Sequence, residues 1–286
     1  AESGIALYSI HTNLDAAPGG VSSALAAQLG LENVRFLEPL GESLFKLATF
    51  IPIDHFDQVR EALATAGAGR IGNYEACAFA TPGRGFFRPG EAADPFIGEA
   101  GGGLESAEEM KLEVEVARWD LNRVVRALQE AHPYEEVAYD VYPVEQPYSQ
   151  AGMGAIGTLA SPMPLFAFLQ HVTERLRAGS LRYVGKPEAS VETVAVCGGS
   201  GSSLTQHALR AGADAYVTAD VTYHRFFDVL DADGRPRMAL IDAGHYETEA
   251  VTEGLIQSWL SQRFPSVEWL RTTTRTSPIE TFVPQR

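Results

Sequence analysis

Apolar runs alternate with amphipathic stretches at both ends of the chain. The runs are short and rich in Val, Ile, Leu and Ala, which predicts buried strands, whereas the amphipathic stretches between them predict helices. Alternating strands and helices predict a layered α/β fold. The expected strands are residues 5–10, 191–197, 215–218, 237–242 and 267–273, and the expected helices are residues 21–30, 164–176, 204–211 and 248–262.

The pattern changes in the middle of the chain. Residues 110–116 alternate between apolar and charged side chains, as in a strand with one buried face. The order of the elements, β-α-β-β-α-β, predicts a ferredoxin-like α+β domain. We therefore expect a discontinuous α/β core, residues 1–43 and 146–286, interrupted by an insert domain at residues 44–145. The insert's expected strands are residues 45–52, 70–79, 110–116 and 137–144, and its expected helices are residues 53–66 and 119–131.

Three glycine-rich stretches interrupt these elements. Residues 82–103 predict an ordered hairpin or a mobile flap. Residues 152–157, Gly-Met-Gly-Ala-Ile-Gly, match the Gly-x-Gly-x-x-Gly fingerprint, but no predicted strand precedes them. We interpret them as a glycine-rich loop that passes close to other backbone, not as a dinucleotide site. Residues 198–203 have two interpretations, a cradle of free amides for an anion or simple turn and capping chemistry.

Composition and charge narrow the possible functions. At 286 residues the chain is long enough for two domains with their own cores. Its formal net charge is 22 − 37 = −15 with no basic cluster, which argues against a nucleic-acid partner. No apolar run is long enough to predict a membrane span. Cys77 and Cys197 both lie in strand-like runs, which indicates reduced core thiols and a cytoplasmic location.

Two predicted strand ends carry side chains that can bind metal. His245 follows an apolar run and a glycine, and Glu249 follows at i+4 on the predicted helix. This spacing points an imidazole and a carboxylate to one side of a helical turn, as two ligands of one metal ion require. A single His-x-x-x-Glu pair is common on helix surfaces, where the histidine caps or packs. His11 and Asp15 follow the run at residues 5–10, however, which favours one shared site at the carboxyl edge of the sheet.

Asp220 and His224 form a third acid–histidine pair at a predicted strand end. They follow the run at residues 215–218, and His224 lies on the helix expected after it. One such pair has most often a structural role, but this pair repeats the placement of the other two. We name His224 and His11 as candidates for proton transfer or for orienting metal ligands.

Three motifs together resemble the NIF-three-like proteins, homologues of the NGG-one-interacting factor three that are also called GTP cyclohydrolase I type 2 homologues. The resemblance covers essentially the whole chain. Residues 44–145, with Gly69-Arg-Ile-Gly-Asn-Tyr and His132-Pro-Tyr-Glu-Glu, resemble the PII-like insert of bacterial members. The three motifs are His11-Thr-Asn-Leu-Asp15-Ala-Ala-Pro-Gly-Gly, Val-Thr-Ala-Asp220-Val-Thr-Tyr-His224 and Asp-Ala-Gly-His245-Tyr-Glu-Thr-Glu249.

The resemblance implies a site for two divalent metal ions per subunit, Zn, Fe or Mn, in a homohexameric toroid that acts on a small-molecule substrate. By position, Asp15, His245 and Glu249 match metal-binding residues of the family. The family's remaining ligands come from a His-His-Pro motif in an N-terminal segment, and this sequence has no counterpart of it. We therefore expect this chain to supply part of the metal shell and to have a sheet with an unpaired edge.

Two functions are consistent with these residues. The first is a metal-dependent hydrolase acting on a nucleotide, a phosphoester or a cyclic amide, because paired metal ions activate water and clamp substrate oxygens. The second is a non-catalytic metal-binding or regulatory protein whose PII-like insert senses a ligand. Both functions need the same metal ligands, so the sequence does not separate them.

Overall fold

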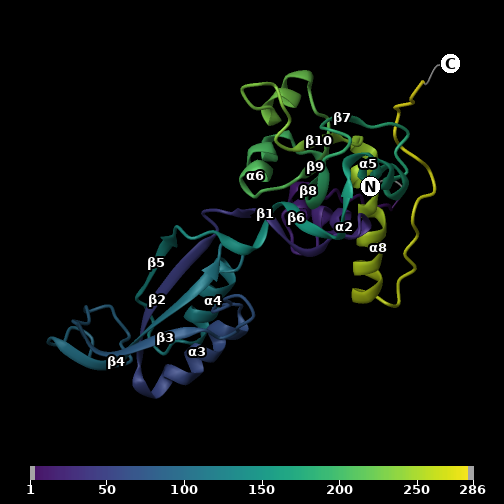
Figure 1. The fold of residues 1–286 in the computed structure, drawn as a ribbon. Helices are drawn as coiled ribbons and strands as arrows, with labels where there is room; N and C mark the ends of the chain where they lie inside the picture. Colours follow the sequence, from purple (N-terminus) through teal and green to yellow (C-terminus); the bar gives the residue numbers. More distant parts are fainter. Residues whose placement is uncertain (1–3, 283–286) are drawn as a thin grey trace. The chain divides into compact units, whose positions relative to one another are not determined.

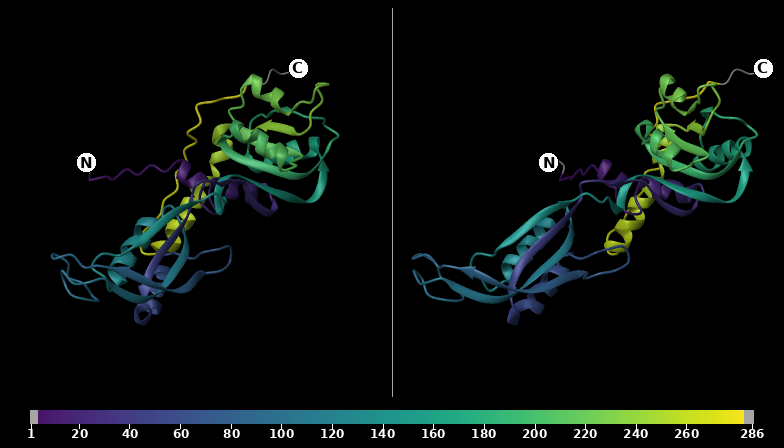
Figure 2. Two further views of the ribbon diagram at one scale, coloured as in Figure 1. Left: turned by 90° about the vertical axis from the view of Figure 1, so that its left-hand side faces the viewer. Right: turned by 60° about the vertical axis from the view of Figure 1, so that its left-hand side comes forward.

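The chain forms two compact units. The computed structural model describes residues 4–282. One unit comprises residues 1–40 and 149–286, and the other comprises residues 41–148. Each unit has its own sheet and helices, as Figures 1 and 2 show. Each also has its own hydrophobic core. The architecture is the predicted mixed α/β fold.

The first unit is built on a six-stranded sheet with the strand order β1-β6-β8-β9-β10-β7. Strands β8, β9 and β10 are parallel, whereas β6 and β7 run antiparallel to their neighbours β8 and β10. Strand β9 is buried along its whole length, which explains its continuous apolar sequence. The strands are β1 Glu32–Leu40, β6 Tyr148–Pro164, β7 Arg182–Val184, β8 Ser190–Ser200, β9 Ala215–Ala219 and β10 Ala239–Asp242.

Helices cover both faces of this sheet. Alternate residues of a strand point to opposite faces, so apolar side chains on both faces need helices to bury them. Val217 of β9 belongs to one core together with Leu25 of α2 and Phe168 of α5. Tyr216, the preceding residue, belongs to a second core with Ala208 of α6. The carboxyl ends of the parallel strands therefore remain the open edge where a site can form. The helices of this unit are α1 Thr12–Asp15, α2 Val21–Gln28, α5 Leu165–Leu176, α6 Thr205–Arg210, α7 His245–Glu249 and α8 Val251–Arg263, with short 3₁₀ helices η2 Ser202–Leu204 and η3 Tyr223–Val229.

The second unit has a four-stranded antiparallel sheet with the order β3-β4-β2-β5. Its helices α3 and α4 bury Val59, Leu63, Val124 and Leu128 against the sheet. The chain order β2-α3-β3-β4-α4-β5 is the β-α-β-β-α-β order that the sequence predicts. The elements are β2 Leu44–Pro52, η1 Ile53–His55, α3 Phe56–Thr65, β3 Ala78–Phe87, β4 Glu105–Ala117, α4 Leu121–Ala131 and β5 Tyr139–Val144.

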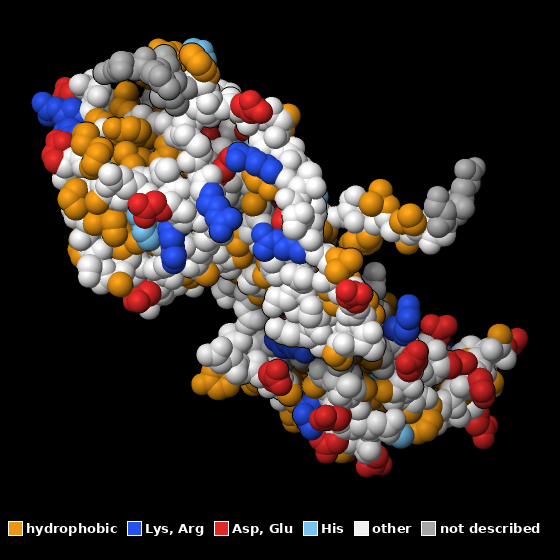
Figure 3. Space-filling view, turned by 90° about the vertical axis from the view of Figure 1, so that its right-hand side faces the viewer, with side chains coloured by type: hydrophobic (Ala, Val, Ile, Leu, Met, Phe, Trp, Pro, Cys, Tyr) orange, Lys and Arg blue, Asp and Glu red, His pale blue; other side chains and the backbone are white. Residues whose placement is uncertain are grey.

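The apolar run at residues 5–10 is not a strand. Leu7 is 92% exposed and Tyr8 is 83% exposed, and no strand of the described chain pairs with this segment. The segment can be followed in Figure 3, where hydrophobic side chains are exposed along it. A strand needs a second strand beside it to satisfy its N–H and C=O groups, and an apolar run in the sequence does not by itself supply that second strand.

The run at residues 267–273 is also not a strand. It lies extended along α8, where Gln257 Nε2 donates a hydrogen bond to the carbonyl of Trp269 (2.8 Å) and Arg271 Nε lies 3.0 Å from Glu253 Oε2. These side-chain contacts replace the ladder of a sheet.

Strand β3 starts later than predicted. Residues 70–77 form turns, with an isolated bridge between Ile71 and Tyr74, and pairing with β4 starts at Ala78. The strand then continues to Phe87 through Pro82 and neighbouring glycines, so the first part of the stretch at residues 82–103 is a strand. An edge strand tolerates proline because one side of its backbone has no sheet partner.

The glycines at residues 152–157 lie inside β6 and not in a loop. A Cβ at Gly157 would lie 2.7 Å from the carbonyl oxygen of Glu32. A Cβ at Gly152 would lie 2.5 Å from the carbonyl oxygen of Glu38. The glycines therefore allow β6 to approach β1 closely, as the sequence predicts, although the predicted loop was wrong. Because no helix follows the glycines, the segment lacks the context of a dinucleotide site.

The two cysteines differ in environment. Cys197 is 5% exposed and belongs to a core of the first unit, as predicted. Cys77 is only partly buried and precedes β3, so its assignment to a core was wrong. Both thiols are free. Within residues 4–282, no helix has both the length and the apolar character needed to cross a bilayer.

His132 is a buried histidine of the second unit and is held in its neutral form. It is 7% exposed, its Nδ1 accepts a hydrogen bond from the Tyr134 amide (3.1 Å), and its Nε2 lies 3.0 Å from the Phe50 carbonyl oxygen. An Nδ1 that accepts has no proton, so Nε2 carries the proton and donates it. Burial lowers the pKa of His132 below the ordinary value.

We expect the stability of the second unit to decrease as the pH falls from about 6.5, the ordinary histidine pKa, through the lower folded-state pKa of His132. In this window the unfolded state binds the proton more readily, so stability rises with pH. Urea denaturation of wild type and His132→Gln across the window measures the effect. The variant should lose this part of the slope, whereas His224→Gln, which changes an exposed histidine of the first unit, should retain it. Equal slopes in all three proteins would contradict this account of His132.

Candidate metal-binding site

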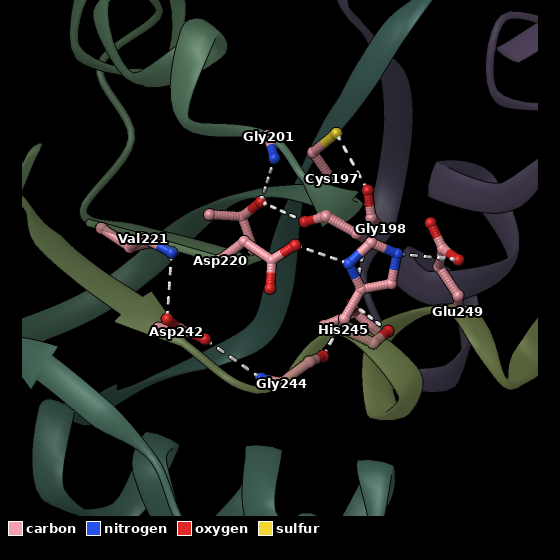
Figure 4. Close-up of polar contacts among 12 residues, drawn as sticks. Cys197, Gly198, Gly201, Asp220, Val221, Asp242, Gly244, His245 and Glu249 are labelled. Carbon is pink, nitrogen blue, oxygen red and sulfur yellow. Dashed lines mark hydrogen bonds and ion pairs between the residues drawn. The ribbon is translucent and has the colours of Figure 1, made fainter. Parts of the chain in front are cut away.

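His245 and Glu249 lie on one side of the first helical turn after β10. Gly244 has φ +91°, a backbone conformation that glycine adopts without strain, and the chain turns there from the strand into α7. The i,i+4 spacing then places Nε2 of His245 3.3 Å from Oε2 of Glu249. The structure therefore brings these two predicted ligands together (Figure 4).

Asp220 holds the other side of the His245 ring. It follows β9, the parallel neighbour of β10, and its Oδ2 lies 2.6 Å from Nδ1 of His245. Asp220 has φ +52°, which is uncommon for a residue other than glycine. Strain of this kind is found where the surrounding structure holds a residue in place for a function. The sequence pairs Asp220 with His224, but the structure pairs it with His245.

The ring of His245 thus lies between two carboxylates. The hydrogen bond to Asp220, followed by the charges of both carboxylates, raises the pKa of His245 against the opposing effect of burial. All three side chains are substantially exposed, so they are accessible from solvent. A histidine that donates through Nδ1 to a carboxylate presents its Nε2 lone pair to a metal ion, an arrangement found at many metal sites.

A glycine pair at the end of β8 forms the wall of this site. Gly199 has φ +59°, and a Cβ there would overlap Oε1 of Glu249 and lie 3.2 Å from Nε2 of His245. A Cβ at Gly198 would meet Val21 of α2. The absence of side chains at these two positions therefore leaves the space in which His245 and Glu249 meet.

Two amides of this glycine-rich stretch are already used within the protein. Gly199 N donates to Thr248 Oγ1 and Gly201 N donates to Thr218 Oγ1, both at 3.0 Å. Thr218 Oγ1 in turn donates to the carbonyl of Gly199 (3.0 Å). Residues 198–200 continue β8, and the short 3₁₀ helix η2 lies between this stretch and α6. At Gly199 and Gly201 the structure therefore favours turn chemistry over an anion cradle, because these two amides are not free.

Asp242 ties together the two backbone segments that carry Asp220 and His245. This residue is 6% exposed, and its Oδ2 accepts hydrogen bonds from the Val221 amide (3.0 Å) and from Arg182 Nη2. Its Oδ1 accepts from the Gly244 amide (3.2 Å). Asp242 was missed in the sequence, although an acidic residue closing an apolar strand is a usable signal for a buried acceptor.

Asp15 lies at the end of α1 and is half buried. Burial raises the pKa of its carboxyl, and the positive charge of His11 opposes the effect. The charges of Asp15 and Glu249 both act on Cys197, whose pKa is raised to about 11, mainly by burial. Asp15 therefore lies in the same neighbourhood as Glu249, although no hydrogen bond or ion pair joins it to the described site residues.

The two candidate proton-transfer residues do not reach the His245 ring. His11 is exposed, and its backbone amide donates to Asn13 Oδ1 (3.1 Å). His224 is exposed on η3, and its ring packs edge-on against that of Tyr223, with the two ring centroids 5.5 Å apart. Within residues 4–282, no three or more His, Cys, Asp and Glu residues are grouped so that they could hold a metal ion.

A polar cavity of about 940 Å³ opens beside His245 and Glu249. The first turn of α8, residues 275–281 of the C-terminal segment and residues 179–180 also line it. Arg275 lies across this cavity, with Nη2 2.5 Å from Glu247 Oε1 and its guanidinium 5.4 Å from the centre of the Tyr246 ring. The site residues thus face a space large enough for a small molecule.

Comparison with known proteins identifies the family. The family model described as Duf34/NIF3 (NGG1p interacting factor 3) matches residues 1–278. A Halalkalibacterium halodurans protein named GTP cyclohydrolase 1 type 2 homolog is 41% identical over 283 residues, covering 98% of this chain and 74% of the relative. A Bacillus subtilis protein of the same name is 42% identical over 258 residues, covering 90% and 68%.

A solved structure agrees with these sequence matches. The structure of a Bacillus cereus protein related to NIF3 superposes with a TM-score of 0.81 at 38% identity, covering 98% of this chain and 75% of that protein. The likeness therefore extends over both units. This chain belongs to the Duf34/NIF3 family.

Proposed function

We propose that this chain is a metal-dependent hydrolase whose His245 and Glu249 bind a divalent ion, with Asp15 contributing from α1. The observation that carries the proposal is the array Asp220–His245–Glu249 at the carboxyl edge of the sheet. The relatives' name, GTP cyclohydrolase 1 type 2 homolog, supports a hydrolytic reaction on a nucleotide or a related cyclic compound.

The side chains present fit a metal ion as part of its shell. With the Nδ1 proton of His245 donated to Asp220, the lone pair of Nε2 faces the Glu249 carboxylate at 3.3 Å. Two acceptors at this distance repel each other unless a cation, either a proton or a metal ion, lies between them. One imidazole with carboxylates is a donor set that suits Zn, Fe or Mn. The described residues do not complete a two-metal shell, and two ions per subunit in a homohexamer stay predictions.

Each residue has a separate role in this proposal. Asp220 fixes the tautomer and the orientation of the His245 ring. A bound metal ion would supply a water of lowered pKa and polarise the substrate. Arg275 lies at the cavity, but its guanidinium is already paired with Glu247 Oε1 (2.5 Å), so an anionic substrate such as a nucleotide or a phosphoester would be held by the bound metal ion.

The proposal is tested by metal content. We expect elemental analysis to find Zn, Fe or Mn in purified wild type and at least about tenfold less in His245→Ala, because removal of a ligand weakens affinity more than removal of its supporting group does. His207→Ala is the matched control, since His207 pairs with Glu38 outside the site (3.2 Å). Equal metal content in wild type and His245→Ala would contradict the site.

Turnover separates the hydrolase from a protein that only binds metal. Nucleotides, phosphoesters and cyclic amides are incubated with metal-loaded wild type and with His245→Ala. We expect product formation by wild type alone. Metal binding without turnover of any of these substrates would leave the site in place and reject the hydrolase.

A further inference from the structure

The second unit contains a cavity of its own. It has a volume of about 650 Å³, within the range of about 300–1,000 Å³ in which small molecules bind to proteins. Strands β2, β3 and β4, residues 134–138 and the loop at residues 89–97 enclose it. None of its lining residues belongs to the His245 site or to the first unit. The cavity therefore has to be explained separately from the metal site.

Aromatic rings form a fixed wall of this cavity. The ring of Tyr134 lies 6.1 Å from that of Phe96 and 6.2 Å from that of Phe87. The Asp94 amide donates a hydrogen bond to Glu135 Oε1 (2.9 Å), which attaches the loop at residues 89–97 to the opposite side. Phe96 nevertheless remains 52% exposed. The wall is thus held in place while an aromatic face stays open to an occupant.

A buried acid, Glu109, lies in this predominantly apolar lining. It is 7% exposed, and a Cβ at Gly85 would overlap its Oε2, so the carboxylate lies directly against the backbone of β3. Oε1 accepts a hydrogen bond from the Tyr134 hydroxyl (2.8 Å). A carboxylate has about four acceptor positions. Among the described residues, the Tyr134 hydroxyl is the single hydrogen-bond partner of the Glu109 carboxylate, which leaves acceptor capacity for a ligand.

No cation of the protein is paired with Glu109 within the described residues. Lys111 and Arg84 line the same cavity, but Lys111 Nζ lies 3.3 Å from Glu113 Oε1 and Arg84 Nη2 lies 3.6 Å from Glu108 Oε1. A buried carboxylate without a cation is costly. The cavity therefore lacks a positive group at its acidic end.

The neighbours of Glu109 do not supply that charge. Burial lowers the pKa of His132, and its Nδ1 accepts a hydrogen bond from the Tyr134 amide, so this ring is not the missing cation. Burial, together with the hydrogen bond and the charge of Glu109, raises the pKa of the Tyr134 hydroxyl well above its ordinary value, so this group remains a donor. Neither group therefore supplies a positive charge to the carboxylate.

We propose that this cavity binds a small aromatic cation, whose amidinium or ammonium group pairs with Glu109 and whose ring packs against Phe87, Phe96 and Tyr134. Each part of the ligand meets a complementary part of the cavity. The charged group takes the free acceptor positions of the buried carboxylate, and the ring covers exposed aromatic surface, with further attraction between a cation and the aromatic faces.

Benzamidine is a suitable probe because it combines a planar ring with an amidinium group. We expect isothermal titration calorimetry on the full chain to detect binding with Kd of about 1 mM or tighter, the affinity reasonable for so few atoms. Benzoate and benzamide, which have the same ring with a negative or a neutral group, should bind at least about tenfold more weakly, a difference of about 1.4 kcal/mol. Equal binding of all three compounds would overturn the charge assignment, and no binding of benzamidine would overturn the proposal.

Variants locate the binding. Glu109→Gln should weaken benzamidine binding at least about tenfold, whereas Glu108→Gln, on the same strand but exposed, should leave it unchanged. Phe96→Ala changes a residue of the loop and provides a second test if Glu109→Gln fails to fold. Glu249→Gln should also bind benzamidine as wild type does, since it removes a carboxylate from the other cavity. Unchanged binding in both Glu109→Gln and Phe96→Ala, or loss in Glu249→Gln, would place the ligand elsewhere and contradict the proposal.

Discussion

Asp242→Ala is expected to lower the free energy of unfolding by about 2–4 kcal/mol and to reduce metal binding together with stability. The substitution leaves the amides of Val221 and Gly244 without their acceptor. Each unsatisfied buried amide costs about 1–3 kcal/mol. Arg182 also loses its partner, but its side chain is largely exposed, so this ion pair contributes little to the expected change.

The functional effect follows from the positions of those two amides. Val221 directly follows Asp220, and Gly244 directly precedes His245, so Asp242 holds both halves of the hydrogen bond to the His245 ring. Urea denaturation and elemental analysis of the same preparations measure the two effects. Asp233→Ala is the control, because Asp233 is exposed and pairs weakly with Arg235 (3.6 Å). If Asp242→Ala had the same stability and metal content as Asp233→Ala, the hydrogen bonds of Asp242 would not support the site.

Gly199→Ala is expected to remove most of the bound metal. The new Cβ would overlap Oε1 of Glu249 and crowd Nε2 of His245, so the carboxylate has to move away from the imidazole. The positive φ of Gly199 adds a cost of about 1–2 kcal/mol for any residue with a Cβ. We therefore expect a destabilised protein whose metal content is at least about tenfold below that of wild type.

Gly212→Ala separates the two causes. Gly212 also has a positive φ, +76°, but a Cβ there has no atom within 4 Å. This variant should show a similar loss of stability, about 1–2 kcal/mol, with metal content unchanged. If both variants retained metal equally, the space beside Glu249 would not matter for binding.

Local geometry explains which parts of the site were predictable. The i,i+4 spacing of His245 and Glu249 fixes their proximity as soon as a helix starts after β10, so the sequence alone predicts the pair. Asp220 is 25 residues from His245 along the chain, and its contact depends on the pairing of β9 with β10. The sequence therefore reveals an acid at a strand end without revealing its partner. Asp15 is also far from His245 along the chain, so its role as a ligand stays a prediction.

The same limit explains the errors in the fold. Alternation and helical periodicity correctly predict α2, α5, β4 and α4, because each of these elements packs one apolar face against a core. Residues 5–10 and 267–273 have the composition of strands but find no strand beside them in the described chain. Conversely, β3 passes through Pro82 and several glycines because pairing with β4 overrides their low strand propensity. Strand pairing depends on two segments, so the composition of one segment does not reveal whether it will find a partner.

The place where the second unit enters the first has a consequence for how such a chain can be assembled. Strand β1 leads into the insert and β6 leads out of it, and these two strands are neighbours in one sheet. The insert thus occupies the position of a hairpin connection. Loop-closure entropy grows only with the logarithm of length, by about 0.6 kcal/mol for each doubling, and a folded insert with adjacent ends costs less still. A gene encoding the first unit alone could therefore gain or lose the insert between Leu40 and Ser149 without a change in the strand order of the six-stranded sheet.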